Sequence, residues 1–205
     1  MLNQGAVAPA IPILCIAWAT AAMSRVDKLI QSYKSYISFS WQENLSGNQR
    51  IIFAIYDKSD ERTLRAKLTE FELCTQQANH GWYHHDLTNA FPVWMAQEDY
   101  KESYFQSPAD LEMLMPEFRA YLAQQLIESL TADTVDTNTV VALSGLSGLF
   151  GFLQVSDLVG QLQPQVRGRL LLFFPGEYEN NNYRFLDARD GWNYLAVPIT
   201  ADKEF

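Results

Sequence analysis

The sequence IIFAIY at residues 51–56 is continuously apolar and too short for a helix of ordinary length. Such a run is typical of a β-strand covered on both faces, because alternate side chains point to opposite sides of a sheet and here all of them are apolar. The stretch therefore predicts a strand of a sheet that is buried between two layers of other structure.

Three further runs predict strands of the same sheet, at residues 82–87, 139–143 and 168–174. The last of them stops at Pro175-Gly176, which predicts a turn, because proline cannot donate to a ladder and glycine accepts unusual dihedral angles. A polar loop is expected to follow around residues 180–182.

Helical periodicity fills the segments between these strands. Residues 26–37 predict an opening helix with Ser24 as its cap. One long helix is expected to carry the apolar face from Leu64 to Cys74, and the longest helix to start at Ser107-Pro108 and extend to Leu130. Shorter helices are expected at residues 91–97 and 156–162.

Alternating strands and helices predict one α/β domain, built as a three-layer, mainly parallel sheet with helices on both faces. The C-terminal part is expected to add an antiparallel hairpin. Its strands would be residues 183–187 and 192–197, and Asp190-Gly191 would supply the positive φ angles of a two-residue turn. Side chains of Tyr183, Trp192 and Tyr194 would then pack across the hairpin.

The composition limits the classes of function. At 205 residues the chain fits one domain, and its two cysteines are too few for a disulfide framework, which favours the cytoplasm. The net charge of −9 argues against a general nucleic-acid-binding surface. Residues 98–136 hold nine acidic and two basic residues, which fits a solvated helix face or a docking surface for a basic partner.

The first 22 residues carry no charged side chain. They lack the basic region of a signal peptide, and Pro9 and Pro12 interrupt a segment already short for a membrane span. We therefore expect residues 1–22 to precede a natural start at Met23 and to be disordered or absent in the native protein. Export and a genuine cytoplasmic extension are the alternatives. Residues 23–205 would form the single domain.

The loops at the predicted strand ends carry no complete catalytic or nucleotide-binding motif. The loop after residues 51–56 has no glycine with which to wrap a phosphate. The glycines at positions 145, 148 and 151 have the wrong spacing for a dinucleotide fingerprint. Ser147 misses the nucleophile-elbow pattern, because Leu149 stands where glycine is required. Tight backbone packing explains these glycines better than chemistry does.

The histidines superficially resemble a metal site, because His80, His84 and His85 lie close to Cys74 and Asp86 in the sequence. Neighbouring side chains on a strand point to opposite faces, so His84 and His85 cannot readily share one ion. His85 or Asp86 at the strand end is a candidate for acid–base chemistry, but the sequence offers no second half of a catalytic pair. We expect ordinary hydrogen-bonding roles, with no metal and no cofactor.

Four stretches of the chain are distinctive: SGLSG at residues 144–148, VSDL at 155–158, RLLLFFPGEY at 169–178 and YRFLDARDGWNYLAVPI at 183–199. Together they resemble the BrxB family of BREX bacteriophage-exclusion systems. The resemblance extends from Met23 to Ile199 and is most specific in the C-terminal part.

The resemblance implies a small cytoplasmic component of a multiprotein defence machine. Other members are the alkaline-phosphatase-like PglZ, the ATPase BrxC and the methyltransferase PglX, and the family has no established catalytic residues to carry over. We therefore expect a non-catalytic adaptor, not an enzyme, that docks to PglZ and supports phage exclusion and host DNA methylation. It would bind neither DNA nor a membrane. The alternative is a degenerate nucleotide-binding domain that regulates the ATPase of the system.

The C-terminal part is the candidate partner-binding surface, because exposed aromatic side chains mixed with arginine are typical of protein interfaces. Ion pairs within the hairpin and cross-strand packing are the alternative roles for the same side chains. The candidate residues are Phe174, Pro175, Gly176, Tyr183, Arg184, Asp187, Arg189, Asp190 and Trp192.

Overall fold

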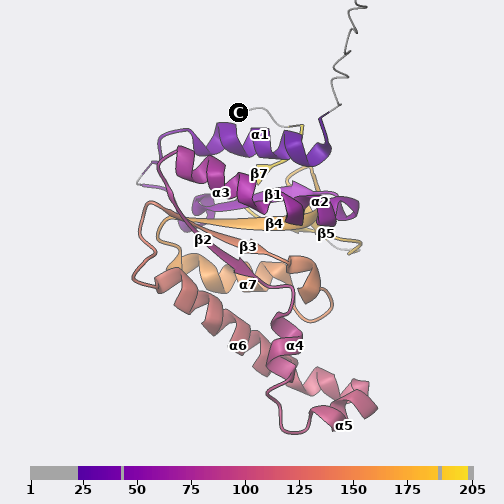
Figure 1. The fold of residues 1–205 in the computed structure, drawn as a ribbon. Helices are drawn as coiled ribbons and strands as arrows, with labels where there is room; N and C mark the ends of the chain where they lie inside the picture. The colour runs from indigo at the N-terminus through magenta and orange to yellow at the C-terminus, as the bar shows by residue number, and fades with distance from the viewer. Residues whose placement is uncertain (1–22, 43, 189–190, 203–205) are drawn as a thin grey trace, which may run out of the picture.

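The computed structural model describes residues 23–42, 44–188 and 191–202, which form a seven-stranded sheet with helices on both sides (Figure 1). The predicted α/β class is confirmed. The expectations about residues 1–22 and about Arg189 and Asp190 lie outside the described residues.

The strands are β1 (Ile51–Tyr56), β2 (Gly81–Asp86), β3 (Thr139–Ser144), β4 (Arg169–Glu179), β5 (Asn182–Phe185), β6 (Trp192–Asn193) and β7 (Val197–Ile199). The helices are α1 (Arg25–Ile37), α2 (Glu61–Ala66), α3 (Leu68–Gln77), α4 (Ala90–Met95), α5 (Lys101–Gln106), α6 (Leu111–Thr131) and α7 (Val155–Leu162).

The sheet is mixed. Its main strands lie in the order β2-β3-β4-β1-β7, and each neighbouring pair in that order is parallel. The second half of β4 pairs antiparallel with β5, which in turn pairs antiparallel with β6. No helix within the described ranges is long and apolar enough to cross a membrane.

Both faces of the sheet are buried, as the apolar run of β1 predicts. Ile51, Phe53 and Ile55 belong to a core cluster shared with α4, α6 and α7, whereas the alternate residues Ile52 and Ala54 join a second cluster with α1 and α3. Figure 1 shows these two helix groups on opposite sides of the sheet. The period-two alternation of a strand thus divides six consecutive apolar residues between two separate cores.

The C-terminal hairpin differs from the predicted one in position. Strand β4 does not stop at Pro175-Gly176 but continues to Glu179, and the turn that joins it to β5 consists of Asn180 and Asn181. Their φ angles of 50° and 64° are those of a two-residue hairpin turn, and asparagine tolerates this region better than most residues. The predicted turn at Asp190-Gly191 includes Asp190, which lies outside the described residues, whereas the pairing of β5 with β6 is described and runs through Tyr183 and Trp192.

Glycine at position 176 has a different role from the predicted turn. There β4 leaves its partner β1, which it accompanies as far as the pair Tyr56–Pro175, and begins to pair with β5. A Cβ atom at Gly176 would overlap the carbonyl oxygen of Arg184, so only glycine lets the two strands approach. Pro175 keeps a bond through its carbonyl, which accepts from the Leu186 N–H at 2.9 Å.

The first helix begins as predicted, with Ser24 as its cap. The Ser24 hydroxyl accepts from the Asp27 N–H at 3.1 Å, and the Asp27 carboxylate accepts in return from the Ser24 backbone, which is a capping box.

The predicted single helix from Leu64 to Cys74 is wrong in one respect. It is divided into α2 and α3 at Lys67, whose φ and ψ of −113° and 10° leave the helical region. The Lys67 ammonium pairs with Asp27, which ties this break to α1.

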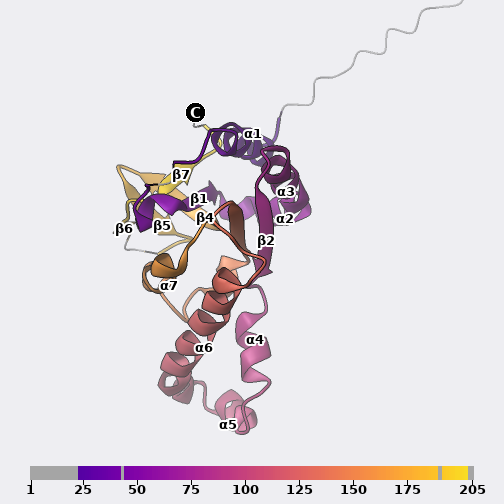
Figure 2. The same ribbon diagram turned by 90° about the vertical axis from the view of Figure 1, so that its left-hand side faces the viewer.

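Helices α4 and α5 and the start of α6 project from the body of the molecule, as Figures 1 and 2 show from two directions. Helix α5 has no buried residue, and Tyr100, Phe105 and Met113 in this region expose most of their surface. Helix α6 is the longest helix, as predicted, and buries Leu114, Phe118 and Leu122 along its stripe.

Candidate functional site

The structure divides the predicted partner-binding residues between the core and the surface. Phe174 and Tyr183 are fully buried, and Pro175 is buried beside them, so these three residues have little or no surface to offer a partner. The Tyr183 ring lies 5.7 Å from the Trp192 ring between β5 and β6, which confirms the expected packing for this pair, whereas the Tyr194 ring lies 6.4 Å from that of Phe53. Trp192 is half-buried, whereas Arg184 is exposed.

The exposed charges of the hairpin region pair with other elements. Arg184 pairs with Glu177 on the adjacent strand β4, and Asp187 pairs with Lys58 at the end of β1. Arg184 and Asp187 therefore do not form the ion pairs that were expected within the hairpin of β5 and β6. Their partners, Glu177 and Lys58, belong to other parts of the chain. Both pairs are exposed, and exposed pairs contribute little stability.

A groove of about 470 Å³ lies beside the hairpin, and we call it the aromatic groove. Its walls come from α6, from the segment before α7, and from β5 and β6. The lining side chains that define it are Arg119, Phe150, Leu153, Val155, Phe185 and Trp192.

The aromatic groove presents anchoring groups of the kind that protein interfaces favour. Phe150 is 48% exposed although its ring packs 5.8 Å from that of the buried Phe185. The Trp192 indole N–H is buried and has no acceptor among the described residues. Arg119 donates from Nε to the Phe152 carbonyl at 3.0 Å, which fixes the guanidinium at the groove wall. Aromatic side chains and arginine at a partly open hollow are the usual hot spots of binding.

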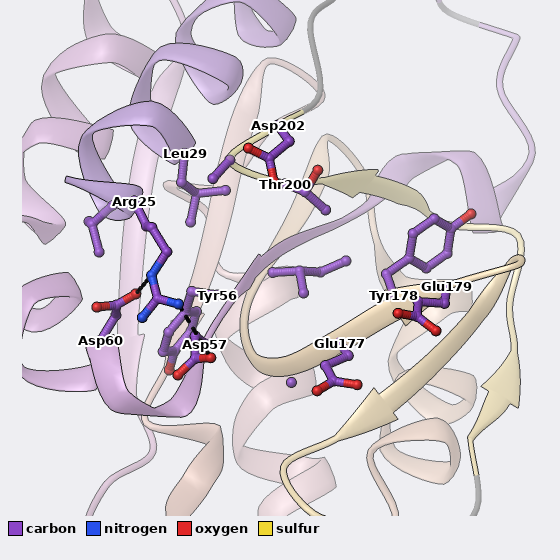
Figure 3. A pocket seen from close by; sticks show the side chains of 14 residues that line it. Arg25, Leu29, Tyr56, Asp57, Asp60, Glu177, Tyr178, Glu179, Thr200 and Asp202 are labelled. Atoms are coloured by element: carbon purple, nitrogen blue, oxygen red, sulfur yellow. Dashed lines mark ion pairs between the residues drawn. The ribbon is translucent and has the colours of Figure 1, made fainter. Parts of the chain in front are cut away.

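A second hollow, the acidic cleft, lies where the parallel strands end, and its volume is about 240 Å³. Figure 3 shows Arg25 reaching from α1 toward Asp57 and Asp60, with Glu177 and Glu179 on β4 across from them. Asp202 completes the set of carboxylates. In open α/β sheets this edge is the usual place for ligands.

The carboxylates of the acidic cleft are largely engaged in structural contacts. Arg25 Nε lies 2.9 Å from Asp60 and Nη1 lies 3.5 Å from Asp57. Asp57 also accepts from the Ser59 N–H at 2.8 Å, and these bonds to Ser59 are the main cause that lowers its pKa. A cleft lined by five carboxylates and one arginine repels phosphate, so this edge does not suit a nucleotide.

The glycine-rich turn after β3 packs closely against the segment after β2. Gly145 has a φ of 74°, and a Cβ atom there would overlap the Thr88 backbone. This confirms that close packing accounts for glycine at this position.

The histidines have hydrogen-bonding partners on different sides of β2. His84 Nε2 lies 2.8 Å from the Ser144 hydroxyl on β3, and His85 Nδ1 lies 3.3 Å from the Ser129 hydroxyl on α6. Burial lowers the pKa of both rings, which favours the neutral form. The described residues include no group of three or more His, Cys, Asp and Glu side chains arranged to hold a metal ion.

Of the six side chains that define the aromatic groove, only Trp192 was predicted from the sequence, and Phe150 and Arg119 are among the five that were missed. Phe150 follows the glycine-rich turn, and its one available signal was a large apolar residue in a loop, which is common. Arg119 sits on the polar side of a predicted helix, where nothing distinguishes it from a solvated charge.

Comparison with known proteins gives one result. The sequence model of the family described as BREX protein BrxB matches residues 94–199, a little over half of the chain. This segment contains every residue that defines the aromatic groove. Searches of curated proteins and of solved structures found no match.

Proposed function

Since the chain belongs to the BrxB family of BREX phage-defence proteins, we propose that it is a non-catalytic adaptor that docks to PglZ. In this role it supports phage exclusion and host DNA methylation from the cytoplasm without contacting DNA itself. BrxC and PglX are further candidate partners in the same complex.

The observation that carries the proposal is the aromatic groove. Phe150 and Trp192 offer apolar surface, the Trp192 N–H lacks an acceptor among the described residues, and Arg119 adds a fixed charge. A protein segment with an apolar side chain and a carboxylate could fill the groove, contact Phe150 and Trp192, and pair with Arg119. Of the residues predicted from the sequence, Trp192 lines this groove, and Arg184 and Asp187 lie outside its lining.

The acidic cleft weakens the alternative of a nucleotide-binding regulatory domain. A nucleotide in an open α/β sheet is held at the carboxyl ends of the strands, where glycine-rich backbone and positive charge receive its phosphates. Here that edge carries Asp57, Glu177 and Asp202. The negative charge instead favours a basic partner at this edge.

The proposal is tested by co-purification of the protein with tagged PglZ. We expect Phe150→Asp to weaken the association about tenfold or more, because a charge in the groove cannot be desolvated without a partner. Phe39→Asp is the matched control, since Phe39 is a similarly exposed phenylalanine that follows α1, far from the groove in sequence and outside its lining.

Circular dichroism and thermal unfolding would establish that both variants fold like the parent protein. If the parent fails to associate with PglZ, or if both variants associate as the parent does, docking through the aromatic groove is wrong.

A further inference from the structure

A third hollow lies at the opposite edge of the sheet from the acidic cleft, and we call it the arginine cavity. Its volume is about 400 Å³. Arg50 precedes β1, Arg167 and Arg169 stand at the start of β4, and Asn138 precedes β3, so the cavity lies at the amino ends of these strands. The remaining lining residues are Trp41, Gln42 and Thr137, and none of the described lining residues is acidic.

Arg169 is a buried charge at the wall of this cavity. It is only 5% exposed, and within the described ranges it forms no ion pair. Its Nη1 donates to the Gly168 carbonyl at 3.1 Å, but its buried Nε has no acceptor among those residues. Burial lowers the pKa of Arg169, and repulsion by Arg50 adds to the effect while Tyr36 opposes it. A buried guanidinium without a carboxylate is costly, so the site favours an anion.

Trp41 contributes a second donor that lacks an acceptor. Its indole Nε1 is buried and finds no acceptor in the described part of the chain. The ring is fixed in place: it stacks on His80 at 3.8 Å, and the Arg169 guanidinium lies 4.4 Å from its centre. His80 is held in turn by Asn138, with 2.6 Å between Nδ1 and Oδ1. Trp41 and Arg169 both line the cavity, and unsatisfied buried donors of this kind mark a place where a water molecule or an ion belongs.

The other two arginines are anchored to backbone carbonyls. Arg50 donates from Nη1 to the carbonyls of Val166 at 3.1 Å and Arg167 at 3.3 Å. Arg167 donates from Nη1 to the Val135 carbonyl at 3.2 Å. A guanidinium has five N–H donors, so the bond to Val135 orients Arg167 without exhausting it.

The carboxylate of Asp136, in the loop before β3, does not neutralise this charge. Asp136 accepts from the Thr139 hydroxyl at 2.6 Å and from the Asn138 N–H at 2.9 Å, and it does not line the cavity. These two bonds lower its pKa and keep it charged, so it helps to shape the loop that carries Asn138.

We propose that the arginine cavity binds a phosphate group carried by a small molecule. Three guanidinium groups supply the donors and the positive charge that the three oxygens of a phosphate dianion require, and the arginine fork fits phosphate in a bidentate manner. A carboxylate offers fewer oxygens and less charge. The site is separate from the proposed docking groove, so the protein would have a ligand site and a partner site on different elements.

The test is a titration of the full chain with sodium phosphate, against sodium chloride at equal ionic strength. Intrinsic tryptophan fluorescence and the unfolding temperature are the two readouts. We expect a saturable fluorescence change and a rise in unfolding temperature with phosphate alone, since a ligand that binds only the folded state stabilises it. AMP and ATP form parallel arms that distinguish free phosphate from a nucleoside phosphate as the source.

Arg167→Ala should weaken binding about tenfold or more, because it removes charge-assisted bonds from an exposed residue whose loss the fold tolerates. Arg62→Ala, at an exposed arginine on α2, should bind as the parent does. Trp41→Phe should abolish the fluorescence change.

Three results would each overturn the proposal. The first is that neither phosphate nor either nucleotide gives a saturable response. The second is that Arg167→Ala binds as tightly as Arg62→Ala, or that the fluorescence change survives in Trp41→Phe. The third is that only a single-stranded DNA oligonucleotide binds, which would indicate a nucleic-acid surface instead.

Discussion

Two asparagines determine the geometry of the C-terminal hairpin. Asn180 and Asn181 both adopt positive φ angles, which most side chains avoid. The Asn181 amide also receives the Tyr178 hydroxyl at 2.9 Å and donates to Asn193 at 2.8 Å, which joins β4, β5 and β6 at their ends. The turn thereby sets the register that brings Trp192 to the aromatic groove.

Replacing Asn180 tests the turn directly. Asn180→Ala should lower the free energy of unfolding by about 1 kcal/mol, because alanine has no side-chain compensation for the left-handed conformation. Asn180→Gly should cost little or nothing, since glycine adopts positive φ freely. Urea unfolding of the three proteins measures the difference. Equal stability of the alanine and glycine variants would mean that the turn has another conformation in solution.

Strand β4 is the element on which the structure departs furthest from the sequence-based expectation. The first part of β4 pairs in parallel with β1 and β3, and its last part pairs antiparallel with β5. The change of partner at Gly176 depends on a close approach to Arg184. This element therefore links the core of the molecule to the hairpin beside the groove.

Two glycine substitutions should have opposite effects. Gly176→Ala should destabilise the protein by about 1–3 kcal/mol, because the added methyl group overlaps the Arg184 carbonyl and the strands must separate. Gly160→Ala should stabilise it by about 0.5–1 kcal/mol, since Gly160 lies in α7 with open space around it. Thermal and urea unfolding measure both. A neutral Gly176→Ala would show that β4 and β5 do not approach this closely.

The elements were predictable where burial alone decides them. The apolar runs of β1 and β3 and the stripe of α6 gave the right strands and helix, because continuous burial leaves a pattern in the sequence. The predicted end of the strand at Pro175-Gly176 was wrong, because the residues that often mark a turn also suit a strand that changes partners. The break at Lys67 has no sequence signal, since neither glycine nor proline stands there, and the partner of Lys67 is Asp27 from another helix.

The candidate site was less predictable than the fold. The aromatic groove joins Arg119, Phe150 and Trp192 from three distant parts of the chain, and only Trp192 belongs to a stretch with a distinctive sequence. The arginine cavity likewise joins Trp41 to Arg169 across most of the domain. Proximity of this kind arises from sheet order, which local patterns do not encode.

At the scale of the whole molecule, charge is separated along the strands. The acidic cleft lies at their carboxyl ends and the arginine cavity at their amino ends, although the net charge of the chain is −9. A basic partner and an anionic ligand are thus directed to opposite edges of one sheet. Salt should weaken both interactions, since much of the charge is partly exposed.

The place of β1 between β4 and β7 has a consequence for how the protein can be divided. The family match begins at Trp94, after β1 and β2, yet β1 is an interior strand of the sheet. A fragment of residues 94–199 would leave β4 with an unpaired apolar edge from Leu170 to Pro175 and β7 without a neighbour. Open edges of this kind template aggregation.

We expect the fragment to precipitate on expression while residues 23–205 remain monodisperse by light scattering. A soluble, monodisperse fragment would contradict this. The segment that carries the family likeness thus lacks two strands of the sheet to which it contributes, β1 and β2.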